Sequence, residues 1–102
     1  RVPTPDGSLV ELVLETEKRA TVEEINAAMK KAAENELKGI MNYSEDFIVS
    51  TDVIGEPYSV TFDSHMTMVL EDGMVKVSGW YDNEYGYTCR VVDLVQRLVD
   101  IM

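Results

Sequence analysis

Alternation of apolar and polar residues marks the beginning of the chain. Between positions 8 and 18 three apolar residues fall on one side of an extended backbone: Val10, Leu12 and Leu14. Glu11 and Glu15 fall on the other side, which is typical of a strand with one solvated face. Leu9 and Val13 interrupt that polar face. We therefore expect a half-buried strand over residues 8–18.

Two later stretches have the periodicity of amphipathic helices. In the first, apolar residues recur at helical spacing: Val22, Ile25, Met29 and Ala32. Thr21, followed three residues later by Glu24, forms a capping box that predicts the start of this helix. Gly39 follows the helix and suits a terminating turn. The second helix is expected from Arg90 to Met102, with an apolar stripe of Val91, Leu94, Val95, Leu98 and Met102.

Between the two helical stretches the pattern breaks into short pieces. The apolar runs predict strands over residues 40–43, 47–50, 59–63, 67–70 and 74–80. Asp72-Gly73 predicts a hairpin turn between the last two of these. The order strand, helix, short strands, helix indicates an α+β domain, in which two helices cover one face of a mostly antiparallel sheet.

Length, charge and cysteine content exclude several classes of protein. The 102 residues fit one small domain. A formal net charge of −10 argues against a nucleic-acid partner, whose phosphates would be repelled. No apolar run approaches the ~18 residues of a membrane span, so we expect no membrane partner. The single cysteine allows no internal disulfide, which is typical of a reducing compartment.

A polar, aromatic-rich corner joins the last predicted strand to the last predicted helix. Asp82, Asn83 and Glu84 follow one another there. Binding sites are common where a strand ends in polar residues and turns into a helix, because rigid elements hold both sides. The same triplet is also typical of a helix cap with favourable first-turn charge. The pattern alone leaves both interpretations open.

This corner and several other stretches resemble one enzyme family. Residues 80–87 read Trp-Tyr-Asp-Asn-Glu-Tyr-Gly-Tyr, followed by Cys-Arg-Val-Val-Asp-Leu at 89–94. This closely resembles the signature near the C-terminus of glyceraldehyde-3-phosphate dehydrogenases. Further stretches resemble the same family, in the same order and at similar spacing: 1–6, 37–40, 43–46, 49–55 and 62–64. The resemblance covers essentially the whole chain.

The resemblance implies that residues 1–102 are the C-terminal half of a catalytic domain whose nucleotide-binding domain lies upstream. The first residue, Arg1, is not a methionine, which also suggests a fragment of a longer chain. The parent enzyme would oxidise glyceraldehyde 3-phosphate with inorganic phosphate and NAD to 1,3-bisphosphoglycerate and NADH, in glycolysis. It would be cytoplasmic and, like the family, tetrameric. NADP in place of NAD stays open.

The resemblance also assigns three site residues. Asn83 matches the asparagine that holds the nicotinamide carboxamide, and an amide offers that group both a donor and an acceptor. Tyr87 matches a tyrosine packed beside the nicotinamide ring. Arg1 matches an arginine of the phosphate-binding region, where a planar fork of donors suits a phosphate. Glu84 is expected to give structural support only.

The groups that perform the family's chemistry are not found in this sequence. The Ser-Cys-Thr-Thr-Asn-type loop of the family's nucleophile does not occur, nor does a Gly-x-Gly-x-x-Gly fingerprint. Cys89 lies where the family has no catalytic group and is expected to be a small buried hydrophobe. His65 is expected on the surface or in a turn, and with Cys89 it makes no metal site. We expect the isolated chain to carry no catalytic residue and to be inactive.

Two hypotheses about function therefore stand side by side. The chain is a fragment of a phosphorylating dehydrogenase, or it is a folded, non-catalytic interaction module. Either way we expect self-association, because the predicted strands over 8–18 and 66–81 would offer unpaired edges and apolar residues to other copies.

Overall fold

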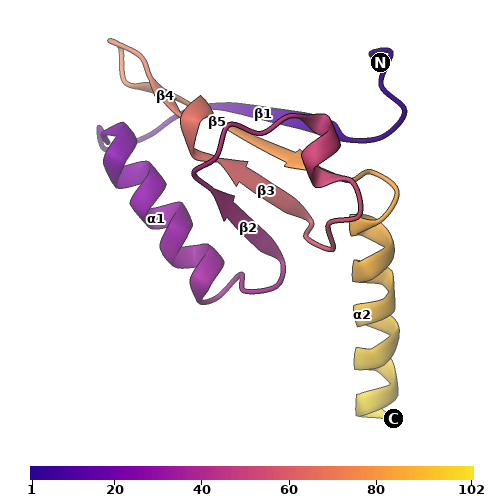
Figure 1. The fold of residues 1–102 in the computed structure, drawn as a ribbon. Helices are drawn as coiled ribbons and strands as arrows, with labels where there is room; N and C mark the ends of the chain where they lie inside the picture. The colour runs from indigo at the N-terminus through magenta and orange to yellow at the C-terminus, as the bar shows by residue number, and fades with distance from the viewer.

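Five strands and two α-helices make up the computed structural model, which describes residues 1–102. The strands are β1 (Ser8–Glu15), β2 (Met41–Ser44), β3 (Val60–Asp63), β4 (Met68–Val69) and β5 (Met74–Tyr81). The helices are α1 (Val22–Glu34) and α2 (Gly86–Ile101), and two short 3-10 helices cover Ser50–Val53 and Ser64–Met66. The expected α+β class is confirmed (Figure 1).

The strands form one mixed sheet in the order β1-β5-β3-β2, and β4 also pairs with β5. β1 and β5 are antiparallel over their whole length, from Ser8 opposite Tyr81 to Glu15 opposite Met74. β3 and β4 are also antiparallel to β5, while β2 and β3 run parallel. The sheet is thus mostly antiparallel, as expected. The parallel pair arises because the chain between β2 and β3 crosses back to the end where β2 began.

Helix α1 begins at the predicted capping box and lies against the sheet beside β2. The Glu24 N–H donates to Thr21 Oγ1 at 3.1 Å, and the Thr21 N–H donates to Glu24 Oε2 at 2.9 Å. Asn26 fixes the helix to the segment after β3, since its Nδ2 donates to the Ser64 carbonyl and its Oδ1 accepts from the Thr67 hydroxyl. The buried apolar core is small and consists of Met41, Val53, Phe62 and Val75.

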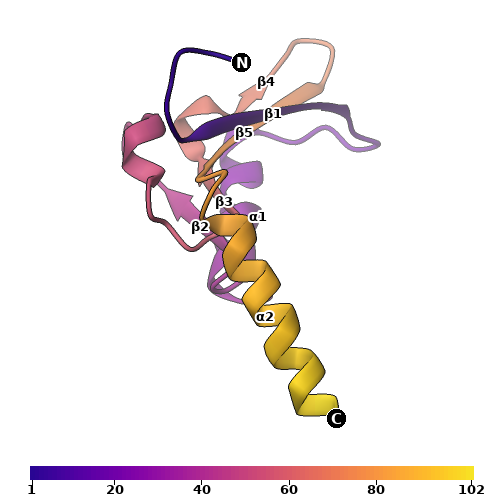
Figure 2. The same cartoon turned by 90° about the vertical axis from the view of Figure 1, so that its right-hand side faces the viewer.

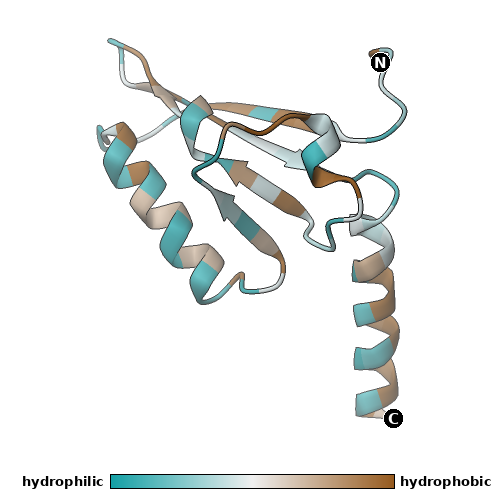
Figure 3. Cartoon of the chain, in the orientation of Figure 1, coloured by the Kyte–Doolittle hydropathy of each residue, from teal (hydrophilic) through white to brown (hydrophobic).

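Helix α2 does not cover the sheet. Figures 1 and 2 show it extending away from one end of the sheet. Its only buried residue is Gly86 at its start, and Figure 3 shows an apolar side running along the rest of it. Members of the predicted stripe are exposed: Val91, Leu94, Val95, Leu98 and Met102. The expectation that both helices cover one face therefore holds for α1 and is wrong for α2, because α2 has no sheet surface beneath it.

Strand β1 is also more exposed than expected. Apolar residues on both of its faces reach solvent: Leu9, Val10, Leu12 and Val13 are each between 41% and 56% exposed. The strand ends at Glu15 rather than Lys18. The expectation of one buried face is wrong because β1 lies at the sheet edge opposite β2, and α1 packs at the β2 side.

The short central elements agree with the sequence except at one place. The turn at Asp72-Gly73 joins β4 to β5 as predicted, with Gly73 at φ +88°. No strand forms over 47–50. There the Asp52 carboxylate accepts the Val49 N–H at 2.7 Å and begins a 3-10 helix instead. No helix has both the length and the apolar character needed to cross a membrane.

Candidate functional site

Asp82 builds the corner between β5 and α2. Its side chain is buried, and its Oδ1 accepts the N–H groups of Glu84 at 2.8 Å and Tyr85 at 3.1 Å. Its Oδ2 accepts the Gly55 N–H at 2.8 Å, and its main-chain carbonyl accepts the Gly86 N–H. One carboxylate thus closes the turn before α2 and attaches that turn to the loop before β3. The interpretation of the triplet as a helix cap is wrong, because Asp82 binds N–H groups that precede α2, and the N-cap residue of α2, Tyr85, makes no side-chain capping hydrogen bond.

Asp82 and Asp6 influence each other's ionisation. Burial alone would raise the pKa of Asp82, but the N–H groups of Gly55, Glu84 and Tyr85, together with the Asp6 side chain, lower it below 3.8. Loss of solvent raises the pKa of Asp6 above 3.8, and the hydrogen bond and charge of Asp82 raise it further, although the Gly7 N–H opposes this. Asp82 is therefore the carboxylate, and Asp6 is the partner that more readily keeps a proton.

Asn83, unlike Asp82, turns its side chain away from the helix. Its Oδ1 accepts the Gly7 N–H at 3.1 Å and the Ser8 hydroxyl at 2.9 Å. These contacts tie the corner after β5 to the first residue of β1, 75 positions earlier in the chain. The Asn83 Nδ2 makes no hydrogen bond within the chain. Asn83 therefore does not cap α2, and one end of its amide is available to a ligand.

A cleft of about 720 Å³ opens beside Asn83. Its wall includes Arg1, Thr4, Ser8, Ser50, Trp80 and Asn83. Trp80 is held in place because its Nε1 donates to the buried Asp63 carboxylate at 3.0 Å. The structure thus brings together two of the three residues that the sequence assigned to the site, Arg1 and Asn83, although the chain's first and eighty-third residues are far apart in sequence.

Tyr87 does not line this cleft. It lies in the first turn of α2, four residues beyond Asn83, and its side chain is 75% exposed. Glu84 is exposed too, and it serves the corner through its backbone: its carbonyl accepts the Thr88 hydroxyl at 2.9 Å. The expected supporting role of Glu84 therefore belongs to its main chain.

Two further residues were considered from the sequence, His65 and Cys89. His65 is exposed in the 3-10 helix after β3, as expected, where it stacks on Phe47 and its Nε2 lies 2.6 Å from the Glu45 carbonyl oxygen. Cys89 was expected to be buried and is only half-buried, because α2 has little covering it. No three His, Cys, Asp or Glu side chains gather closely enough to hold a metal ion.

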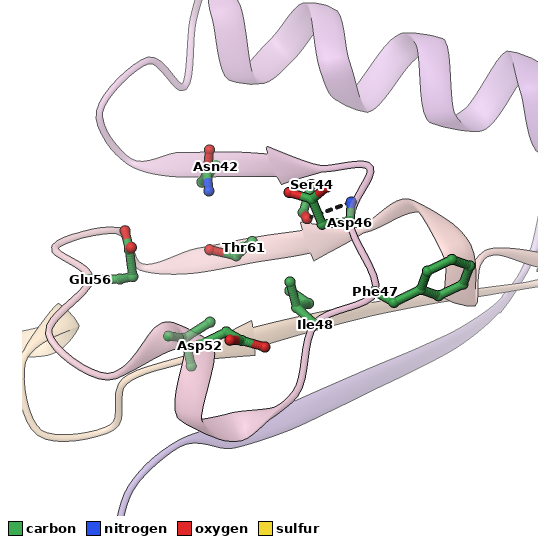
Figure 4. Close-up of a pocket in the computed structure, with 9 residues that line it drawn as sticks. Asn42, Ser44, Asp46, Phe47, Ile48, Asp52, Glu56 and Thr61 are labelled. Atoms are coloured by element: carbon green, nitrogen blue, oxygen red, sulfur yellow. Dashed lines mark hydrogen bonds between the residues drawn. The ribbon is translucent and has the colours of Figure 1, made fainter.

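A second, smaller cleft of about 330 Å³ lies between β2, β3 and residues 46–56 (Figure 4). It contains none of the site residues assigned from the sequence. Two of its polar side chains hold the loop that forms it: the Ser44 hydroxyl accepts the Asp46 N–H at 3.1 Å, and the Asp52 carboxylate accepts the Val49 N–H. These groups have a structural role in shaping the loop.

Sequence reasoning missed the two groups that hold Asn83. Nothing near Gly7 and Ser8 in the sequence points to residue 83, because their contact depends on the register of β1 against β5. The one available signal was the Asp6-Gly7 pair, which predicts a turn at the start of β1.

Comparison with known proteins adds an independent observation. A family model described as the C-terminal domain of glyceraldehyde 3-phosphate dehydrogenase matches residues 1–83. A glyceraldehyde-3-phosphate dehydrogenase of Geobacillus stearothermophilus is 61% identical over 94 residues, which are 92% of this chain and 28% of that protein. The corresponding enzyme of Borreliella burgdorferi is 54% identical over 101 residues, 97% of this chain and 30% of that protein. The chain thus spans less than a third of the length of these relatives.

Proposed function

Because the chain belongs to the glyceraldehyde-3-phosphate dehydrogenase family, within its C-terminal domain, we propose that it forms the C-terminal half of the catalytic domain of a phosphorylating enzyme. That enzyme oxidises glyceraldehyde 3-phosphate with inorganic phosphate and NAD, in the cytoplasm and as a homotetramer. The observation that carries the proposal is the shared cleft of Arg1 and Asn83, where a donor for phosphate and a donor for a carboxamide face one space.

The chain's own residues bind and orient rather than react. The free Nδ2 of Asn83 suits the carboxamide of a nicotinamide. Bound NAD would supply the hydride acceptor. The exposed ring of Tyr87 would gain a neighbour when the nicotinamide ring packs against it, and the aromatic face would exclude water there. Arg1 would meet a phosphate with its planar fork of donors. The nucleophile and the base are contributed by the part of the enzyme outside these residues.

A hybrid enzyme tests this proposal directly. In it, these 102 residues replace the matching segment of the Geobacillus stearothermophilus relative. We expect the hybrid to reduce NAD with glyceraldehyde 3-phosphate and phosphate. Asn83→Ala should lower kcat/KM for NAD by a factor that corresponds to about 1–3 kcal/mol. This is the usual effect of leaving a buried polar group, here the nicotinamide carboxamide, without its partner.

A neighbouring substitution provides the control for that experiment. Glu84→Ala removes an exposed side chain from the same turn but leaves its backbone contacts, so the hybrid should keep its activity. An Asn83→Ala hybrid that is as active as the parent would show that Asn83 has no part in binding the cofactor.

The isolated chain is expected to have no dehydrogenase activity, because the nucleophile loop and the dinucleotide fingerprint are not in its sequence. The alternative function is a non-catalytic interaction module, and the exposed apolar side of α2 is the feature that favours it. The hybrid decides between the two: a folded tetrameric hybrid without activity would favour the interaction module. NAD reduction by the purified 102-residue chain would contradict both.

A further inference from the structure

We propose that Ser8 is a positioning residue for the cofactor amide: with the N–H of Gly7, its hydroxyl holds Asn83 so that Nδ2 alone faces the ligand. The inference rests on the proposed function, since it concerns how the same asparagine recognises a nicotinamide. Ser8 belongs to β1, and its role determines whether Asn83 binds the carbonyl oxygen or the NH₂ group of the ligand amide.

The contact with Gly7 decides which way the Asn83 amide points. A backbone N–H can only donate, so the atom that faces it at 3.1 Å must be the carbonyl oxygen Oδ1 and not Nδ2. The Ser8 hydroxyl, 2.9 Å from the same oxygen, then acts as the second donor. Both lone pairs of Oδ1 are thereby used inside the protein. Nδ2, with two hydrogens, is left for the ligand.

The two donors are themselves held in fixed positions. Gly7 has φ +92°, and a Cβ placed on it would lie 2.6 Å from the Ser50 carbonyl oxygen. Only glycine fits this approach, which sets the direction of the Gly7 N–H. Ser8 is paired opposite Tyr81 in the β1–β5 ladder, so its hydroxyl cannot slide along the strand without shifting the whole register.

The backbone of Asn83 is fixed from the other side. Its neighbour Asp82 is buried, and its carboxylate binds the two N–H groups that follow Asn83 in the chain. Asn83 is therefore held at its main chain by Asp82 and at its side chain by β1. A side chain with one free end and no freedom to turn is preorganised for its ligand, because little conformational entropy is lost on binding.

The arrangement selects a hydrogen-bond acceptor on the ligand. A carboxamide could meet a freely turning asparagine in two ways, with its carbonyl oxygen or with its NH₂ group. With Oδ1 already occupied, only the carbonyl oxygen finds a partner here. The nicotinamide carboxamide is thus recognised through its oxygen, and its NH₂ group makes no bond to Asn83.

The hybrid enzyme and one cofactor analogue test the inference. The analogue is 3-acetylpyridine adenine dinucleotide, which keeps the carbonyl oxygen and has a methyl group in place of NH₂. For the hybrid, Asn83→Ala should raise the KM values of NAD and the analogue by the same factor. Ser8→Ala should raise the KM for NAD by about three- to tenfold, as expected for the loss of one hydrogen bond.

The ratio of the two KM values distinguishes positioning from a general structural effect. In Ser8→Ala only the Gly7 N–H still holds the Asn83 oxygen, and that N–H is shared with the Asp6 carboxylate, which it meets at the shorter distance of 2.8 Å. The Asn83 amide can then turn more easily and accept from the NH₂ group of NAD, so the analogue should become a poorer substitute for NAD. Ser8→Thr keeps a hydroxyl and should restore the ratio of the hybrid. Thr16→Ala removes a hydroxyl just beyond the other end of β1, where it serves only the Lys18 carbonyl, and should change neither value.

Each outcome supports or overturns a defined statement. An active hybrid in which Ser8→Ala leaves both the KM for NAD and the ratio unchanged overturns the role of Ser8 and leaves the proposed function standing. A folded hybrid that does not reduce NAD overturns the proposed function and this inference with it. If Ser8→Ala does not fold, Ser8→Cys, which has a weaker donor, must shift the ratio of the two KM values in favour of NAD, and an unchanged ratio overturns the inference.

Discussion

Gly55 and Asp82 are joined by a hydrogen bond, in which the Gly55 N–H donates to Asp82 Oδ2 at 2.8 Å across 27 positions of the chain. The other oxygen of the same carboxylate holds the N–H groups that follow Asn83. The position of the asparagine thus depends on a buried charge that does not itself line the cleft. Buried carboxylates are kept ionised in this way when several N–H groups converge on them.

Removal of that carboxylate should destabilise the chain. Asp82→Ala leaves the N–H groups of Gly55, Glu84 and Tyr85 without their acceptor, and we expect the free energy of unfolding to fall by about 2–3 kcal/mol. Urea unfolding at a low micromolar protein concentration measures this loss of unfolding free energy. Asp93→Ala is the control, because Asp93 pairs only with Arg90 on the surface of α2 and should cost less than about 0.5 kcal/mol. Equal losses for the two variants would contradict the role assigned to Asp82.

Ionisation of Asp6 should weaken the fold as the pH rises. Its pKa is raised in the folded chain, so its contribution to stability is present in full below pH 3.8 and is lost as the pH rises through the raised value. Asp6→Asn should keep the acceptor for the Gly7 N–H and add a donor toward Asp82. The gain in unfolding free energy of Asp6→Asn over the parent should therefore grow as the pH rises above 3.8. A gain that does not vary between pH 3 and pH 7 would refute the coupling.

Asp82 has the opposite dependence. Its pKa is lowered, so the stability it supplies is present above 3.8 and is lost as the pH falls through the lowered value. The Asp6→Asn variant retains this acid-induced loss. Its unfolding free energy should therefore still fall at the acid end of the titration, which serves as an internal control for the measurement above.

Gly86→Ala should be destabilising although alanine favours helices. A Cβ on Gly86 would lie 2.6 Å from the Tyr58 carbonyl oxygen, so the first turn of α2 must move away from the loop before β3. Overpacking of this kind costs about 1–3 kcal/mol, more than the ~1 kcal/mol that alanine gains over glycine in a helix. Thermal unfolding shows which effect wins. Val92→Ala, at an exposed position of the same helix, should be close to neutral, and a stabilised Gly86→Ala would mean that the loop yields easily.

The isolated chain should self-associate through α2 and β1. Sedimentation equilibrium at tens of micromolar protein should give a mass above 11.5 kDa in physiological salt. Added salt should strengthen association, because a net charge of −10 repels other copies and is screened over about 8 Å at 0.15 M. The double substitution Leu94→Glu and Leu98→Glu should lower the mass by charging the exposed side of α2.

A matched variant identifies the contribution of the sheet edge. Val13→Lys charges the exposed edge strand and leaves α2 unchanged, so it should lower the mass only if β1 takes part. A parent chain that sediments as a monomer under these conditions would show that neither surface recruits other copies.

Local features of the fold were predictable because their signals lie within a few residues. The capping box of Thr21 and Glu24 places the start of α1, and Asp72-Gly73 places the hairpin, without reference to the rest of the chain. The prediction of a strand over residues 47–50 was wrong for a related reason. A short apolar run does not reveal that the Asp52 carboxylate accepts the Val49 N–H.

What covers an element could not be predicted. Periodicity records that α2 has an apolar side and that β1 has apolar residues on both faces, but it does not say which surface lies against them. The same distinction between local signals and long-range contacts applies to the candidate site. Asn83 was assigned to the site from the resemblance of its surroundings to a family signature, whereas its contact with Ser8 exists only after β1 and β5 have paired in one register.

Helix α2 is attached to the rest of the molecule only near its start. Gly86 is its only buried residue, and the Arg90 guanidinium reaches the Gly39 carbonyl and the Ser59 hydroxyl. Sixteen residues without a packed face are near the limit at which a helix persists in water. Backbone amides beyond Arg90 should therefore exchange with deuterium far faster than those of β5. Any surface that covers the apolar side would slow this exchange, and because Tyr87 lies in the first turn of α2, it would stiffen the corner between β5 and α2 at the same time.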